Sequence, residues 1–295
     1  MKLKEYIETR LKEINSEIDN IFEESDIELE NQFLEMMKYP LDAGGKRIRP
    51  ILTLLACEFF SEDYKKAIIP AISLELIHTY SLVHDDLPSM DNDDFRRGKH
   101  TTHIKYGEAN AILVGDALLT TAFQILTKSS INNDSLRKVL YEISYASGYQ
   151  GMVMGQMLDL YFENKQLDFE MLKNIHSKKT AAMIRAAIRV GALCSEQSSI
   201  NIENITKYGE YIGLAFQIQD DILDVISDKD TLGKTAGKDQ NVGKLTYVKQ
   251  FGLEEAKNKA NDAIEKAIKS LDNYQNSNAK SILIELAKYI VERQN

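Results

Sequence analysis

The distribution of proline limits what this chain can fold into. The four prolines are Pro40, Pro50, Pro70 and Pro88, and none follows in the remaining two-thirds of the sequence. Because proline interrupts helix interiors, so long a stretch without it is typical of a mostly helical protein. Apolar residues recur at helical spacing over ten ranges, and alternating strand patterns are scarce. The ranges are 3–21, 27–38, 50–60, 64–87, 108–128, 134–164, 168–195, 202–226, 253–271 and 278–293.

No linker or low-complexity tract divides these ranges, so we predict one all-α domain over residues 1–295. Ser61, Asp168 and Asn201 stand where helical ranges begin and are plausible N-cap residues. Three stretches interrupt the helical pattern and are rich in glycine or charge. They span 42–50, 88–103 and 227–244.

Two clusters of aspartates stand near matched positions in the two halves of the chain. The members are Asp85, Asp86 and Asp91 in the first cluster and Asp220, Asp221 and Asp224 in the second. Ionised carboxylates this close repel by roughly 1 kcal/mol per pair even in water, so we expect cations at both clusters. Asp220 and Asp224 are four residues apart and therefore share one helix face. Pro88 should end or bend the first helix and carry Asp91 back toward Asp85.

The chemistry of the clusters favours magnesium and a phosphate-bearing substrate. Oxygen ligands without nearby Cys or His at ligand spacing suit Mg²⁺ or Mn²⁺ better than zinc. Bound Mg²⁺ usually keeps waters and takes phosphate oxygens of a substrate. Basic residues stand in the loops where an anion would bind: Lys46, Arg47 and Arg49 follow a Gly-Gly turn, and Arg96 and Arg97 follow the first cluster.

Composition narrows the function classes and the compartment. The formal net charge of -9 argues against a nucleic-acid partner, which would need a basic face. Cys57 and Cys194 lie inside apolar helical patterns, and their spacing matches no metal or redox motif. The N-terminus has no apolar signal segment, and no run approaches the ~20 apolar residues that a membrane span needs. We therefore expect a cytoplasmic protein with reduced thiols and no membrane span.

The motifs resemble those of the trans-prenyltransferases, the isoprenyl diphosphate synthases, over nearly the whole chain. Within that family they are most similar to bacterial farnesyl diphosphate synthases, which share the expanded first aspartate motif with Pro88 inside it. One departure is His100, where many relatives have proline. The motifs that carry the resemblance are Gly44-Gly45-Lys46-Arg47-Ile48-Arg49-Pro50, Asp85-Asp86-x4-Asp91 with Arg96-Arg97-Gly98, Gly155-Gln156-x2-Asp159, Lys179-Thr180, and Phe216-Gln217-x2-Asp220-Asp221-x2-Asp224.

The resemblance implies a fold, a reaction and an assembly. The implied fold is a bundle of about ten core helices around a deep central cavity, usually as a homodimer. The implied reaction is the Mg²⁺-dependent, head-to-tail condensation of dimethylallyl or geranyl diphosphate with isopentenyl diphosphate, giving (2E,6E)-farnesyl diphosphate and diphosphate. It requires three Mg²⁺ ions, for which Mn²⁺ is expected to substitute.

The resemblance also implies roles for individual residues. Two Mg²⁺ ions would be bound by Asp85, Asp86 and Asp91, and the third by Asp220 with support from Asp224. The residues implied for the allylic diphosphate are Arg96, Lys179, Thr180, Gln217, Lys234 and Lys244. The residues implied for isopentenyl diphosphate are Lys46, Arg49, His78 and Arg97. The glycine- and lysine-rich stretch 227–244 would close over the charged mouth as a lid.

Product length and the reaction itself leave alternatives open. Tyr80 and Ser81 precede Asp85 by about one helical turn, and in this family an aromatic residue there resembles a floor that stops elongation at fifteen carbons. A geranylgeranyl diphosphate synthase is the nearest alternative. A class I terpene cyclase would not need the second diphosphate site, and a non-catalytic helical subunit would usually have lost an aspartate cluster.

Overall fold

Helices make up nearly all of the regular structure, which confirms the all-α prediction. A computed structural model describes residues 2–163, 165, 167–226 and 245–293. The chain begins with α1 (Leu3–Ile21), α2 (Glu28–Asp42), α3 (Ile48–Phe60), the 3₁₀ turn η1 (Tyr64–Ala67) and α4 (Ile68–Asp85). A short hairpin of β1 (Phe95–Arg96) and β2 (Lys99–His100) leads to α5 (Thr102–Tyr106), α6 (Glu108–Leu126), α7 (Asn133–Ser147) and α8 (Met152–Phe162). The remaining elements are α9 (Phe169–His176), the π-helical turn η2 (Ser177–Ala181), α10 (Ala182–Cys194), α11 (Ser199–Ile226), α13 (Tyr247–Phe251), α14 (Leu253–Lys269) and α15 (Asn278–Glu292).

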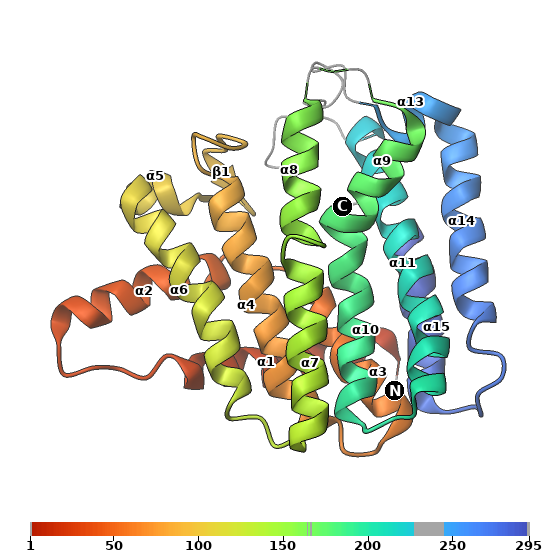
Figure 1. Ribbon diagram of the computed structural model, residues 1–295, viewed down its shortest axis with the longest axis horizontal. Helices are drawn as coiled ribbons and strands as arrows, with labels where there is room; N and C mark the ends of the chain where they lie inside the picture. Colours follow the sequence, from red (N-terminus) through yellow and green to blue (C-terminus); the bar gives the residue numbers. More distant parts are fainter. Residues whose placement is uncertain (1, 164, 166, 227–244, 294–295) are drawn as a thin grey trace.

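The long helices stand side by side, and α4 and α10 lie in the interior of the bundle (Figure 1). α4 packs against α3 and α6, while α10 packs against α3, α7 and α11. Leu76 and Ile77 of α4 and Ile188 of α10 are fully buried. At Gly191 the backbones of α10 and α3 approach closely, because an added Cβ would lie 2.3 Å from the carbonyl oxygen of Thr53. Helices that are apolar on most sides need neighbours on most sides, which places these two at the centre.

The helix predicted over 134–164 is in fact two helices, α7 and α8. The chain leaves α7 in a turn in which the amide of Gly151 donates to the carbonyl oxygen of Gly148 at 3.0 Å. An added Cβ at Gly151 would lie 1.9 Å from the carbonyl oxygen of Ala146, so the turn requires glycine there. Apolar residues recur at helical spacing on both sides of the turn, and the sequence pattern therefore concealed the break.

Of the three predicted N-caps, one is confirmed. Asp168 caps α9, and its carboxylate accepts a hydrogen bond from the amide of Met171 at 2.7 Å. Ser61 instead ends α3, where its amide donates to the carbonyl oxygen of Cys57. Asn201 lies inside the first turn of α11, and the hydroxyl of Ser198 accepts from its amide at 3.3 Å. Serine and asparagine suit turns as well as caps, so composition alone did not fix these positions.

Both cysteines are buried and free, as expected. The expectation that no apolar run reaches membrane-spanning length was wrong, because two helical segments are long and apolar enough. The segments Tyr64–Asp85 and Glu108–Leu126 both reach it, with 67% and 39% of their most apolar windows buried inside the protein. A buried core helix meets the same criterion, and most of α4 within the first segment is buried in the helical bundle.

Candidate active site

The first aspartate cluster is formed by the end of α4 and a loop that turns back on it. α4 ends at Asp85, and the following residues form a turn at Pro88. The amide of Asp91 donates to the carbonyl oxygen of Asp85 at 2.8 Å, and the amide of Asp93 donates to that of Asp86 at 3.2 Å. These two bonds fold the loop onto the helix end. The prediction that the chain carries Asp91 back toward Asp85 is therefore confirmed.

Arg96 neutralises part of this cluster. Its Nε lies 2.7 and 2.8 Å from the two carboxylate oxygens of Asp86, and Asp93 lies 3.7 Å from its Nη2. The Asp86 side chain is only 4% exposed, so the pair is almost fully enclosed. The β1–β2 hairpin holds Arg96 in this position. In this structure the guanidinium expected at the allylic diphosphate is thus committed to a carboxylate of the cluster.

Asp85 keeps an unusually high proton affinity. Burial raises its pKa to about 6, Lys179 opposes that shift, and Asp91 adds to it. Tyr80 lies one turn earlier on α4, is 7% exposed, and packs edge-on against the ring of His84 at a centroid distance of 5.8 Å. Ser81 donates its hydroxyl hydrogen to the carbonyl oxygen of His78 at 2.9 Å.

Lys179 and Thr180 lie on the π-helical turn η2, which joins α9 to α10. The ammonium of Lys179 lies 2.6 Å from a carboxylate oxygen of Asp159 on α8. α8 and η2 meet at Gly155, where an added Cβ would lie 2.2 Å from the amide nitrogen of Lys179. π-Helical turns occur frequently at functional sites, and this one carries two of the residues expected to bind substrate.

The second cluster lies on α11, and its first aspartate meets the end of the chain. The guanidinium of Arg293 contacts the carboxylate of Asp220 and donates to the carbonyl oxygen of Phe216 at 3.2 Å. It also lies over the ring of Phe216, 4.0 Å from the centroid. Burial raises the pKa of Asp220, while Arg293, Arg49 and Lys46 oppose that shift. Arg293 was not predicted as a site residue, because no local signal links it to a carboxylate 73 residues away.

Asp221 has a structural role on the neighbouring face of α11. Its carboxylate accepts a hydrogen bond from the amide of Tyr247 at 2.8 Å, and it is 6% exposed. Gln217 Nε2 lies 3.5 Å from the other carboxylate oxygen. These contacts hold the start of α13 against α11, whereas Asp224 is half-buried one turn beyond Asp220.

The residues expected at isopentenyl diphosphate interact electrostatically with one another. Burial lowers the pKa of His78 well below its usual range, and the positive charges of Arg49 and Arg97 lower it further. The imidazole is therefore neutral. Arg97 donates to the carbonyl oxygen of Gly44, and its guanidinium fills the space that a Cβ at Gly45 would need. The Gly-Gly turn is therefore required for close packing of Arg97.

Two further basic residues border this cationic group. Burial lowers the pKa of Lys46, and the positive charge of Arg293 lowers it further. Because Arg293 contacts Asp220, this interaction links the cationic group to the second cluster. Arg47 points the other way: it forms a buried ion pair with Glu75 at 2.7 Å and donates to the carbonyl oxygen of Leu41. Arg47 thus anchors the loop and leaves anion binding to its neighbours. The predicted ligands Lys234 and Lys244 lie outside the described residues.

Comparison with known proteins identifies the family. A family model described as polyprenyl synthetase matches residues 30–286. The chain is also 47% identical over 265 residues to farnesyl diphosphate synthase of Escherichia coli, covering 88% of this chain and 89% of that protein. The chain belongs to the polyprenyl synthetase family.

Other members show how wide the similarity runs. Geranylgeranyl pyrophosphate synthase 7, chloroplastic, of Arabidopsis thaliana is 42% identical over 265 residues, which cover 88% of this chain and 76% of that protein. The crystal structure of geranylgeranyl pyrophosphate synthetase from Pyrococcus horikoshii superposes with a TM-score of 0.89 at 35% identity, covering 99% of this chain and 98% of the other. The isoprenyl synthase fold implied by the sequence motifs is therefore confirmed.

The described carboxylates fit the divalent ions that this family implies, but they are not gathered into a ready ligand set. No group of three His, Cys, Asp or Glu side chains within the described ranges is close enough to hold a metal ion. Instead, arginines contact Asp86 and Asp220. The donors are all oxygens, which suits Mg²⁺, and cationic side chains already stand where positive charge is required.

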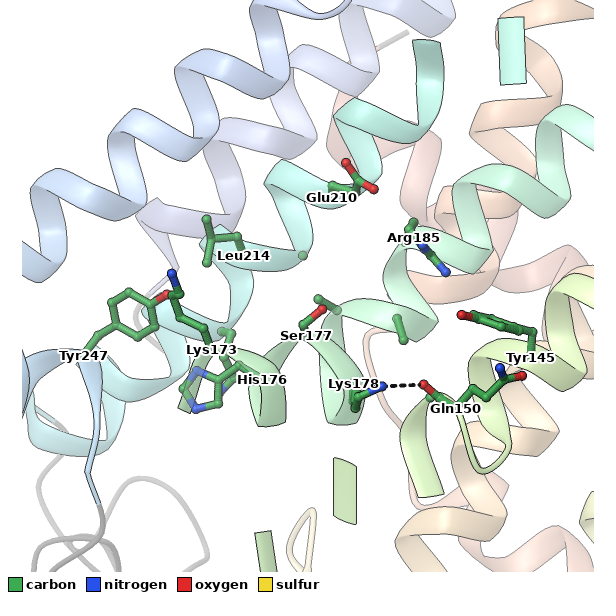
Figure 2. A pocket seen from close by; sticks show the side chains of 15 residues that line it. Tyr145, Gln150, Lys173, His176, Ser177, Lys178, Arg185, Glu210, Leu214 and Tyr247 are labelled. Atoms are coloured by element: carbon green, nitrogen blue, oxygen red, sulfur yellow. Dashed lines mark hydrogen bonds between the residues drawn. The ribbon is translucent and has the colours of Figure 1, made fainter. Parts of the chain in front are cut away.

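A groove runs along the helical segment that carries Lys179 (Figure 2). Its volume is about 430 Å³, and α7, η2, α10 and α11 contribute to its walls. Lys178 lines this groove and donates to the carbonyl oxygen of Gln150 at 2.9 Å, whereas neighbouring Lys179 contacts Asp159. Gln217, which lies 3.5 Å from a carboxylate oxygen of Asp221, also lines the groove, so the groove borders the second aspartate cluster.

Proposed function

We propose that the protein is a Mg²⁺-dependent prenyltransferase. It condenses dimethylallyl or geranyl diphosphate with isopentenyl diphosphate to give (2E,6E)-farnesyl diphosphate and diphosphate. The observation that carries the proposal is a second cationic group beside the aspartate clusters. Carboxylates with metal ions account for one diphosphate, and the group formed by Lys46, Arg49, His78 and Arg97 accounts for another. A condensation reaction requires two diphosphates, whereas a cyclase requires one.

At the allylic diphosphate, positive charge would stabilise the leaving group. Bound Mg²⁺ would offset the negative charge that builds on the departing diphosphate. Lys179, held beside the first cluster by Asp159, adds a fixed positive charge that needs no reorganisation during reaction. The remaining proposed members of this site are Asp85, Asp86, Asp91, Asp220, Asp224, Arg96, Thr180, Gln217, Lys234 and Lys244.

At isopentenyl diphosphate, the chain would supply orientation. Lys46, Arg49 and Arg97 would bind the diphosphate, and neutral His78 would donate a hydrogen bond to it. The attached double bond is then held next to the allylic carbon, where it attacks the allylic cation. Aliphatic residues of α4 would face the reacting chains and exclude the water that would quench the cation. The released diphosphate is the expected base for the final proton.

The direct test is turnover of purified protein with geranyl and isopentenyl diphosphates, followed by chromatography of the products. We expect a fifteen-carbon diphosphate with Mg²⁺ or Mn²⁺ and no product after thorough chelation. A cyclase would consume an allylic diphosphate without isopentenyl diphosphate, and a non-catalytic subunit would turn over neither. Equal turnover after chelation would refute the proposal.

Product length depends on Tyr80 in this proposal. Relatives named as farnesyl and as geranylgeranyl synthases both match the chain, and the buried ring of Tyr80 below Asp85 favours the shorter product. Tyr80→Ala should lengthen the product to twenty carbons or more. Tyr141→Ala removes a 65% exposed ring on α7 and serves as the matched control with unchanged product. An unchanged chain length in a folded Tyr80→Ala variant would remove Tyr80 as the floor.

We further propose a cytoplasmic homodimer, in keeping with the family. A stripe of exposed apolar side chains supports dimerisation: Val153, Met157 and Tyr161 recur every four residues on α8 and are 48%, 47% and 56% exposed. Such a stripe is unusual on a helix that faces only water. Buried, free Cys57 and Cys194 agree with a reducing compartment. Sedimentation of the wild type and a Met157→Glu variant would test the dimer.

A further inference from the structure

The C-terminal turn places Arg293 at the second aspartate cluster in a well-defined way. The Arg293 side chain is 8% exposed, whereas that of Asp220 is 42% exposed. Its backbone amide donates to the carbonyl oxygen of Tyr289 at 3.1 Å, and its carbonyl oxygen accepts from Nε2 of Gln219 at 3.2 Å. Together with the contacts to Phe216, these bonds fix the guanidinium from both sides. The backbone of this turn therefore presents the guanidinium to Asp220.

We infer that Arg293 is a positioning residue that supplies the positive charge at Asp220 in the metal-free protein and gives way when a divalent ion binds there. The inference rests on the proposed function, since it assigns Asp220 to a metal site. It adds that the affinity of this site is set in part by the end of the chain.

The reason is competition for one carboxylate. A guanidinium on Asp220 uses a lone pair that a metal ion would need, and its charge repels a divalent ion at the same distance. Burial and, after it, the charge of Arg293 lower the pKa of Lys46, so a second positive charge stands near Asp220. Displacing Arg293 relieves this repulsion, and it also releases the last turn of α15 from α11.

Binding of Mn²⁺ in the presence of inorganic pyrophosphate, measured by calorimetry, tests the competition. Arg293→Met removes the charge and keeps most of the apolar contact with Phe216. We expect this variant to bind the Asp220-dependent ion about tenfold more tightly, the lower end of what a neighbouring charge does to a carboxylate's proton affinity. Lys288→Met removes an exposed charge from the same helix and should leave the affinity unchanged. Asp220→Asn should remove one bound ion in either background.

Hydrogen exchange in the wild type gives a second readout that needs no variant. Peptides covering residues 286–293 should exchange faster when Mn²⁺ and pyrophosphate are added, because the turn loses its anchor on α11. Equal Mn²⁺ affinity in wild type and Arg293→Met, or unchanged exchange despite bound Mn²⁺, would overturn the role of Arg293. Failure of folded wild type to bind Mn²⁺ with pyrophosphate would instead overturn the proposed function.

Discussion

The two aspartate clusters solve one electrostatic problem in different ways. In the first, Asp86 pairs with an arginine ten residues ahead, and both side chains are largely enclosed at 4% and 18% exposure. In the second, Asp220 pairs with Arg293, 73 residues later in the chain. The Arg293 side chain is 8% exposed, but that of Asp220 is 42% exposed. The first pair is built by a local hairpin and the second by the docking of the C-terminal helix.

This difference indicates which arginine stabilises the fold and which one a metal ion can replace. Breaking an enclosed ion pair strands a buried charge and costs several kcal/mol. Breaking a pair whose carboxylate is accessible costs much less, because water or a metal ion replaces the lost partner. We therefore expect displacement of Arg96 from Asp86 to cost more free energy than displacement of Arg293 from Asp220.

The largest expected effect is a loss of turnover when an aspartate of either cluster is replaced. Asp85→Asn should lower kcat by about a thousandfold, and Asp220→Asn by about a hundredfold, because the first cluster is expected to hold two of the three ions. Steady-state turnover with geranyl and isopentenyl diphosphates measures both. Asp134→Asn, at an exposed carboxylate on α7, is the control and should be unaffected. A larger loss of kcat in Asp220→Asn than in Asp85→Asn would contradict the greater importance assigned to the first cluster.

The arginines should differ in stability rather than in turnover. Arg96→Met is expected to lower the free energy of unfolding by about 3 kcal/mol, because Asp86 is left buried without its partner. Arg293→Met should cost only about 1 kcal/mol. Urea unfolding in the presence of a chelator measures both values. Arg137→Met, from a pair that is 80% and 57% exposed, should change stability by less than ~0.5 kcal/mol. Equal losses at Arg96 and Arg293 would show that the two pairs do not differ in the way that the comparison requires.

A smaller effect should appear in the pH dependence of the metal-free protein. Burial raises the pKa of Asp85 from 3.8 to about 6, so the folded state holds a proton that the unfolded state has released in this window. Wild-type stability should therefore fall by roughly 1 to 2 kcal/mol relative to Asp85→Asn as pH rises from about 4 to 6. Paired unfolding curves at each pH measure this difference. A relative gain over that window would contradict the assignment.

The sequence predicted those features that depend on local pattern. The turn at Pro88, the shared face of Asp220 and Asp224, and the helical class all follow from spacing and from proline chemistry. The contact between Arg293 and Asp220 could not be predicted, since tertiary docking alone brings them together. The pairing of Arg96 with Asp86 was missed for another reason: an arginine beside a carboxylate cluster suits either the carboxylate or a phosphate, and sequence does not choose between them.

The π-helical turn between α9 and α10 has a consequence for the architecture as a whole. Leu172 before the turn belongs to a small apolar cluster with α11, α13 and α14, while Met183 and Ile184 after it belong to the main core. Each turn of a regular helix advances 3.6 residues, so the wider turn resets the angular phase of everything downstream. The continuous helical segment α9–η2–α10 can in this way direct its apolar face into two separate hydrophobic clusters. Deleting one residue from the segment Ser177–Ala181 would rotate one helix relative to the other, so that one of them would lose its packing against its hydrophobic cluster.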